Sequence, residues 1–148
     1  MRAVKQFKEF IDKGTAKKQS QDRPRAEFLR NEAEKSYAYL NKLIKKMGID
    51  DENANDYVKR CYDIIMALIR SMMLLKGYNA AGFGAHEAEV SYMMVLGFKE
   101  NDVRFADQLR YFRNGILYYG SDLDKEYALK VIEFTKRIYE RLMSLPFK

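Results

Sequence analysis

Residues 50–77, DDENANDYVKRCYDIIMALIRSMMLLKG, decide the fold. Apolar side chains recur along this stretch at helical spacing and occupy more than one side, which predicts a central helix covered by its neighbours. The acidic residues at its start suit the positive N-terminal end of a helix dipole. Gly77 predicts a left-handed stop after the last turn. The apolar positions of this predicted helix are Tyr57, Cys61, Ile64, Ile65, Leu68, Met72 and Leu75.

The same periodicity predicts one helix before this stretch and a short one after it. Asp22 is a favourable N-cap residue and Pro24 suits a first turn, so the earlier helix begins there. Its apolar residues continue to Gly48. The short helix runs from about 85 to 96 and stops at Gly97, because glycine is typical of the position just after a helix.

Two further helices follow towards the C-terminus. The first starts near 101–102 and carries apolar residues at helical spacing as far as Gly120. Ser121 or Asp122 is expected to cap the second, since both residue types are common N-caps. Pro146 ends this last helix, because proline cannot continue the hydrogen-bond ladder.

Two segments carry weaker patterns. A short apolar stripe begins at Val4 and predicts an N-terminal helix that extends to about Gln19, although Gly14 weakens it. Residues 77–84 are rich in glycine but lack both the Lys-Ser/Thr ending of a phosphate-binding loop and a preceding strand. We therefore expect this second segment to be a loop between helices.

Together these elements predict an all-α fold, an antiparallel up-and-down bundle of about five to six helices. The 148 residues suit a single domain, and a hydrophobic content of 47% excludes a disordered chain. Within the domain at 1–148, we expect an N-terminal helix or arm over about 1–21 and the bundle over about 22–145.

Composition excludes several classes of protein. One cysteine, Cys61, rules out an internal disulfide and a Cys-rich zinc site, and one histidine rules out any site that needs two from one chain. We therefore expect neither a metal site nor a cofactor. No apolar run is long enough for a membrane span and no signal peptide is visible, so a cytoplasmic location is expected.

The basic surplus lies in the N-terminal third. The net charge is +6, and residues 1–47 hold 13 basic and 6 acidic residues, while the remainder holds 14 and 15. Such a surplus attracts nucleic acid or another polyanion. It is equally typical of a solvated, lysine-rich helix face.

Two places carry residues suited to chemistry. His86 stands where the glycine-rich segment enters the short helix, as a base, a ribose contact, or a capping or packing residue. Arg110, Arg113, Asn114 and Tyr118 lie near the end of an apolar helix, where polar groups are costly to bury without partners. They fit a phosphate site, because arginine is a planar bidentate donor, or an Arg–Asp tie at a close helix crossing.

Three short motifs resemble the HEPN domain family. They are LIRSMMLLKGY at 68–78, AHEA at 85–88 and RNGILYYG at 113–120. They are similar to the family's central helix with a Lys-Gly-Tyr-like turn, its His-Glu-like entry to a short helix and its Arg-Asn-x3-His motif. The resemblance spans about residues 24–143 and matches the predicted order of helices.

The resemblance implies a helical bundle that dimerises around the Arg-Asn motif. Many members are metal-independent ribonucleases, often toxins paired with a nucleotidyltransferase antitoxin, in which the motif arginine polarises the phosphate and the histidine transfers a proton. Arg113 and Asn114 match that motif here, but Tyr118 occupies the position of the histidine. With an ordinary pKa near 10, tyrosine is a poor base at neutral pH.

Three functions follow as expectations. The first is a homodimer, joined through the helix at 102–119, that binds RNA or a nucleotide through Arg110, Arg113, Asn114, Tyr118 and His86. The second is an active ribonuclease in which Arg113 and Tyr118, or another group in place of Tyr118, are catalytic. The third is a non-enzymatic interaction protein, such as the partner of a nucleotidyltransferase-type protein.

Overall fold

The computed structural model describes residues 4–119 and 122–148, and for residues 116–119 it describes the backbone only. In this part of the chain there are six helices and two short strands, which confirms the predicted all-α bundle. In chain order they are α1 (Phe7–Lys13), β1 (Ala16–Lys18), α2 (Arg23–Met47), α3 (Ala54–Lys76), β2 (Tyr78–Ala80), α4 (Ala85–Val95), α5 (Glu100–Tyr119) and α6 (Lys125–Ser144).

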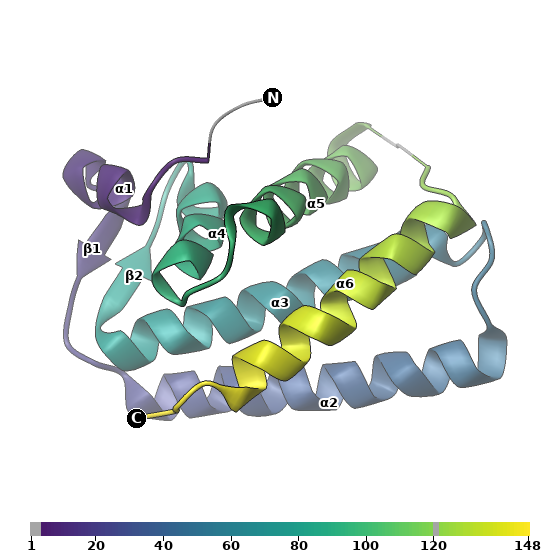
Figure 1. Cartoon of the computed structure of the whole chain (residues 1–148), viewed down its shortest axis with the longest axis horizontal. Coiled ribbons are helices and arrows are strands. Elements are labelled where there is room, and N and C mark those ends of the chain that lie inside the picture. The colour runs from purple at the N-terminus through teal and green to yellow at the C-terminus, as the bar shows by residue number, and fades with distance from the viewer. Residues whose placement is uncertain (1–3, 120–121) are drawn as a thin grey trace.

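Helix α3 is the centre of the bundle, as the sequence predicts. It contacts α2, α4, α5 and α6, and Figure 1 shows α2 along one side of it with α6 crossing in front. Every apolar position predicted for α3 is buried, and Cys61 and Ile69 are completely inaccessible. Burying such side chains is the main favourable contribution to folding, so α3 holds the other helices in place.

The start of α2 follows the predicted capping. The Asp22 side chain accepts a hydrogen bond from the backbone N–H of Arg25 at 3.1 Å, and Pro24 lies in the first turn. The helix ends at Gly48, whose N–H donates to the Ile44 carbonyl. Both ends of α2 are therefore set by local sequence.

The predicted N-terminal helix is wrong in its extent. Helix α1 stops at Gly14, which is left-handed with φ of 81°, and the chain continues as β1 instead of reaching Gln19 in a helix. Strand β1 pairs antiparallel with β2, with Ala16 opposite Ala80. Because Ala16 is 1% exposed in this pairing, tertiary burial outweighs the local helical pattern.

The glycine-rich segment at 77–84 is also not only a loop, because β2 lies within it. Gly77 makes this possible. It has φ of 85°, and a Cβ atom there would lie 2.6 Å from the Gln19 carbonyl oxygen. The Gln19 N–H donates to the Gly77 carbonyl at 2.8 Å, so this close approach joins the N-terminal arm to the end of α3.

Helix α6 begins later than predicted. Its N-cap is Asp124, whose carboxylate accepts from the Tyr127 N–H at 2.9 Å. Asp122 instead accepts a hydrogen bond from the Asn55 amide of α3, and Ser121 lies outside the described residues. A tertiary contact thus engages the expected cap, and the next suitable aspartate takes its place.

The described residues contain neither a membrane-spanning helix nor a cluster of metal ligands. None of their helices combines the length and the apolar character that crossing a membrane requires. Over residues 4–119 and 122–148, no group of three or more His, Cys, Asp or Glu side chains is arranged to hold a metal ion.

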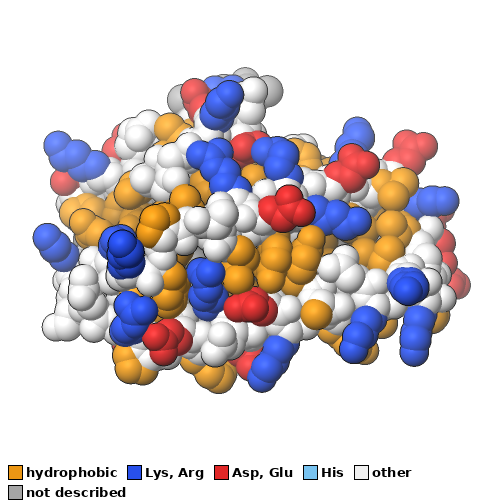
Figure 2. Space-filling model, turned by 60° about the horizontal axis from the view of Figure 1, so that its bottom comes forward, with side chains coloured by type: hydrophobic (Ala, Val, Ile, Leu, Met, Phe, Trp, Pro, Cys, Tyr) orange, Lys and Arg blue, Asp and Glu red, His pale blue; other side chains and the backbone are white. Residues whose placement is uncertain are grey.

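On the face drawn in Figure 2, charge alone does not mark a site. Figure 2 shows the face that comes forward when the bottom of Figure 1 is turned to the viewer, with lysines and arginines scattered among apolar side chains. Several arginines also lie over aromatic rings in cation–π contacts, such as Arg60, whose guanidinium carbon is 5.2 Å from the Tyr39 ring centre. Specific contacts, rather than charge, distinguish one arginine from another.

Candidate functional site

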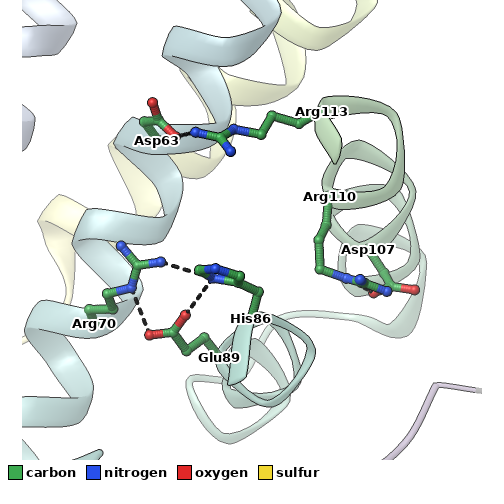
Figure 3. A network of polar contacts seen from close by, with 7 residues as sticks. All are labelled: Asp63, Arg70, His86, Glu89, Asp107, Arg110 and Arg113. Carbon is green, nitrogen blue, oxygen red and sulfur yellow. Dashed lines mark hydrogen bonds and ion pairs between the residues drawn. The ribbon is translucent and has the colours of Figure 1, made fainter. Parts of the chain in front are cut away.

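Charged side chains of α3, α4 and α5 form three separate groups of contacts in the region where these helices meet (Figure 3). Helix α3 supplies Asp63 and Arg70, α4 supplies the imidazole and a carboxylate, and α5 supplies two arginines and an aspartate. We call this group the arginine cluster. Its members are Asp63, Arg70, His86, Glu89, Asp107, Arg110 and Arg113.

Arg70 and Glu89 form the fixed part of the cluster. The Arg70 Nε donates to Glu89 Oε2 at 2.6 Å, and the Glu89 side chain is only 7% exposed. Burial lowers the pKa of the Arg70 guanidinium, but the hydrogen bond and charge of Glu89 outweigh burial and leave this pKa raised. This ion pair links α3 to the start of α4.

His86 joins this pair through its Nδ1 atom. That nitrogen lies 3.1 Å from an Arg70 terminal nitrogen and 3.2 Å from Glu89 Oε1. A neutral ring can accept from Arg70 or donate to Glu89 through Nδ1, depending on its tautomer. In the second case Nε2 is left as a free acceptor, which is the arrangement of an oriented proton acceptor.

The two α5 arginines are held more loosely. Arg113 donates to Asp63 at 3.3 Å across to α3, and Arg110 donates to Asp107 one turn back at 2.8 Å. The Arg113 Nε is buried and has no hydrogen-bond partner among the described residues. Since a guanidinium has five N–H donors, one contact to one exposed carboxylate leaves most of this capacity unused.

A tyrosine lies beneath the cluster. The Arg113 guanidinium carbon is 5.6 Å from the centre of the Tyr62 ring, and Tyr62 is 5% exposed. Burial raises the pKa of the Tyr62 phenol to about 12, against the lowering effect of Arg110 and Arg70. Arg113 therefore lies over a buried, neutral ring in addition to its exposed counter-ion, Asp63.

Three of the residues singled out from sequence, Arg110, Arg113 and His86, lie in this region, each in a contact of its own with Asp107, Asp63 and Glu89 respectively. Asn114 is half-buried beside Arg113 on α5, and its amide adds no described contact to the cluster. The side chain of Tyr118 lies outside the described residues. The Arg–Asp tie expected as the structural alternative is present between Arg113 and Asp63.

Sequence reasoning missed Asp63, Arg70 and Glu89, although a signal for each exists. Asp63 and Arg70 bound the longest apolar run of α3 and are seven residues apart, so they share one face of that helix. Glu89 follows His86 by three positions, which also places both on one face. Charged residues that interrupt a buried helix are the general indication.

What the cluster can do chemically follows from its donors. Arginine side chains from two helices can bind the oxygens of one phosphate with charge-assisted hydrogen bonds, and His86 can add a further contact or exchange a proton.

Comparison of the chain with protein-family models, with curated proteins and with solved structures finds no match.

Proposed function

We propose that this protein is a HEPN-like module that binds single-stranded RNA through the arginine cluster. The observation that carries the proposal is that Arg70, Arg110 and Arg113, from two helices, all act electrostatically on the buried Tyr62, while the sole histidine contacts Arg70. Phosphate contacts from arginine supply most of the affinity for RNA. The basic surplus of residues 1–47 supports the approach of a polyanion.

The carboxylates of the cluster do not block such a ligand. The side chains of Asp63 and Asp107 are 59% and 43% exposed, so their ion pairs contribute little to stability. A phosphate can replace them as the partner of Arg113 and Arg110. Glu89 remains with Arg70 and keeps that side chain in position.

A second copy of the chain belongs to the proposal, because the HEPN resemblance implies dimers joined around the Arg-Asn motif. Tyr111 supports this seam, since it is 69% exposed on the same helix, α5. Sedimentation over micromolar concentrations tests it. A monomer throughout would remove the dimer and leave RNA binding to one chain.

The test is one gel with labelled single-stranded RNA in EDTA. We expect wild-type protein to retain RNA in a salt-dependent way and Arg113→Ala to weaken retention about tenfold. The matched control is Arg137→Ala, which removes the same charge from an ion pair with Asp102 at the start of α5, outside residues 1–47. Equal retention by both variants would contradict the site.

The same gel tests a second candidate, a metal-independent ribonuclease, which the contact between His86 and Glu89 favours. The His86 Nε2 would take the proton of a ribose 2′-hydroxyl while that oxygen attacks the phosphate and the bond to the 5′-oxygen breaks. The leaving 5′-oxygen would take a proton from water. Cleavage in wild type that is lost in His86→Ala would support this candidate, and intact RNA would leave the binding module.

If the chain neither retains nor cleaves RNA, the result favours the third expected function, a non-enzymatic interaction protein. Co-purification with a nucleotidyltransferase-type protein would then be the deciding measurement. A stable complex between the two proteins, without nucleic acid, would replace the RNA proposal.

A further inference from the structure

A groove beside the arginine cluster is left without a role by RNA backbone binding. It has a volume of about 480 Å³ and lies between the N-terminal segment, α1, α4 and α5. Phe10, Val90 and Phe105 contribute apolar walls, and the exposed amides of Asn101 and Gln108 line it as well. Its volume falls within the range of small-molecule sites, about 300–1,000 Å³.

The groove and the arginine cluster are neighbours. Asp107 lines the groove and also holds Arg110 at 2.8 Å. A ligand with its charged group in the cluster could therefore place an uncharged part in the groove.

The chemistry of the groove suits a nucleobase. Its charged lining residues have partners of their own, such as Lys5 with Glu87 at 3.9 Å and Arg104 with Glu100 at 2.7 Å. The amides of Asn101 and Gln108 offer both donors and acceptors, as the edge of a base requires. The apolar walls suit the faces of the ring.

We infer that the groove binds the base of a nucleotide whose phosphate lies in the arginine cluster. This inference rests on the proposed function for the phosphate, and the groove adds selection for a nucleoside. The N-terminal arm has a purpose in this arrangement, because Phe10 forms part of the wall. The ring of its neighbour on α1, Phe7, packs 4.9 Å from that of Tyr92 on α4, which fixes the arm against the bundle.

The test is calorimetric titration with three probes, namely AMP, ribose 5-phosphate and adenosine. We expect wild-type protein to bind AMP at least about tenfold more tightly than ribose 5-phosphate. Gln108→Leu removes a hydrogen-bonding amide at an exposed position and should reduce this preference several-fold. Asn31→Leu, an exposed position on α2, is the matched control and should change nothing.

A second variant fills the groove. Val90→Phe should abolish the preference for AMP over ribose 5-phosphate while leaving the affinity for ribose 5-phosphate unchanged. Thermal unfolding checks that this variant is folded, because Val90 is buried. If it does not fold, Gln108→Leu still decides the matter.

The outcomes separate the two proposals. Equal affinity for AMP and ribose 5-phosphate in wild type would overturn the proposal that the groove binds a base. It would leave the proposed phosphate site in the arginine cluster unaffected. Two results together would support base binding in the groove and overturn the phosphate site. The first is adenosine binding that Gln108→Leu weakens, and the second is ribose 5-phosphate binding that Arg113→Ala does not change. A short single-stranded RNA that displaces AMP would identify RNA as the source of the nucleotide, and failure to displace it would identify a free nucleotide.

Discussion

Two arginine–aspartate pairs connect α5 to its neighbours, and they differ in kind. At the start of α5, Arg137 of α6 donates two hydrogen bonds to Asp102, at 3.0 and 2.8 Å. Near its other end, Arg113 donates one hydrogen bond of 3.3 Å to Asp63 of α3. The first is a bidentate pair on a carboxylate that is 14% exposed, and the second is a single contact to an aspartate that is largely exposed.

The difference separates a structural pair from a binding side chain. The fork of Arg137 is matched to its carboxylate, which is the geometry that stabilises a protein. Arg113 makes a single hydrogen bond to its aspartate, and its buried Nε has no partner among the described residues. Both lie over rings at 5.6 Å, but Arg137 covers Phe134 and Arg113 covers Tyr62, which can ionise.

The largest expected effect is on RNA affinity, which tests whether the arginines of the cluster differ from the structural arginine Arg137. The double variant Arg110→Ala/Arg113→Ala should lower RNA affinity about 100-fold and reduce the slope of log affinity against log salt by about 1–2, because two phosphate contacts are lost. The control is Arg137→Ala/Arg141→Ala, which removes the same charge from α6. Filter binding at several salt concentrations measures both, and equal losses would show that charge alone matters.

The next prediction concerns the free energy of unfolding, for which the Arg137–Asp102 pair should matter more than the Arg113–Asp63 pair. Asp102→Ala should lower the free energy of unfolding by about 1–2 kcal/mol, since it leaves the guanidinium without its bidentate partner. Asp63→Ala should change it by less than about 0.5 kcal/mol, as exposed pairs contribute little. Urea unfolding of both variants checks this, and a larger loss for Asp63→Ala would make Arg113 the structural residue.

Alkaline pH should then distinguish the two rings. The folded pKa of Tyr62 is raised to about 12, above its ordinary value of about 10 in the unfolded chain. The unfolded state therefore loses this proton first, so the stabilisation is complete below pH 10 and is lost between about pH 10 and 12. The loss is up to about 1.4 kcal/mol per pH unit for one group.

Tyr62→Phe removes that contribution and should make the fall in stability from pH 9 to 12 less steep. Unfolding midpoints in urea at each pH provide the measurement. The parallel change Phe134→Tyr beneath Arg137 should make the fall steeper. An unchanged slope in Tyr62→Phe would show that other groups cause the alkaline loss, with Cys61 the first to test because burial raises its pKa to about 11.

The smallest effect sharpens the comparison most directly. Asp63→Asn keeps the shape of the side chain but removes the charge that competes with a phosphate for Arg113. RNA affinity should rise about two- to fivefold, whereas Asp102→Asn should leave it unchanged. A fall in affinity for Asp63→Asn would indicate that the aspartate positions Arg113 for the ligand.

Local sequence predicted most of the fold. The bounds of α2 and the burial of α3 follow from Asp22, Gly48, Gly77 and the spacing of apolar residues, all of which act within a few turns. The predicted elements failed where distant residues compete, as with β1, whose pairing with β2 depends on residues far along the chain. Such pairings have no local pattern.

The candidate site was half predictable for the same reason. Arg110 and Arg113 stand out because polar groups interrupt an apolar helix. Their relation to Arg70 and Glu89 depends on how α3, α4 and α5 are placed, which spacing within one helix does not report. The sequence motif therefore indicates the two arginines of α5, whereas Arg70 and Glu89 can be assigned to the site only from the packing of the helices.

The pairing of β1 with β2 also sets an order of events during synthesis. Ala16 pairs with Ala80, so the arm leaves the ribosome well before its partner strand and α4 exist. At about 5–20 residues per second, the arm waits several seconds with Phe7 and Phe10 uncovered. Both side chains are buried in the finished protein. The wall of the groove is therefore synthesised early and assembled late, and a nascent chain halted before α4 presents two phenylalanines to chaperones or to other nascent chains.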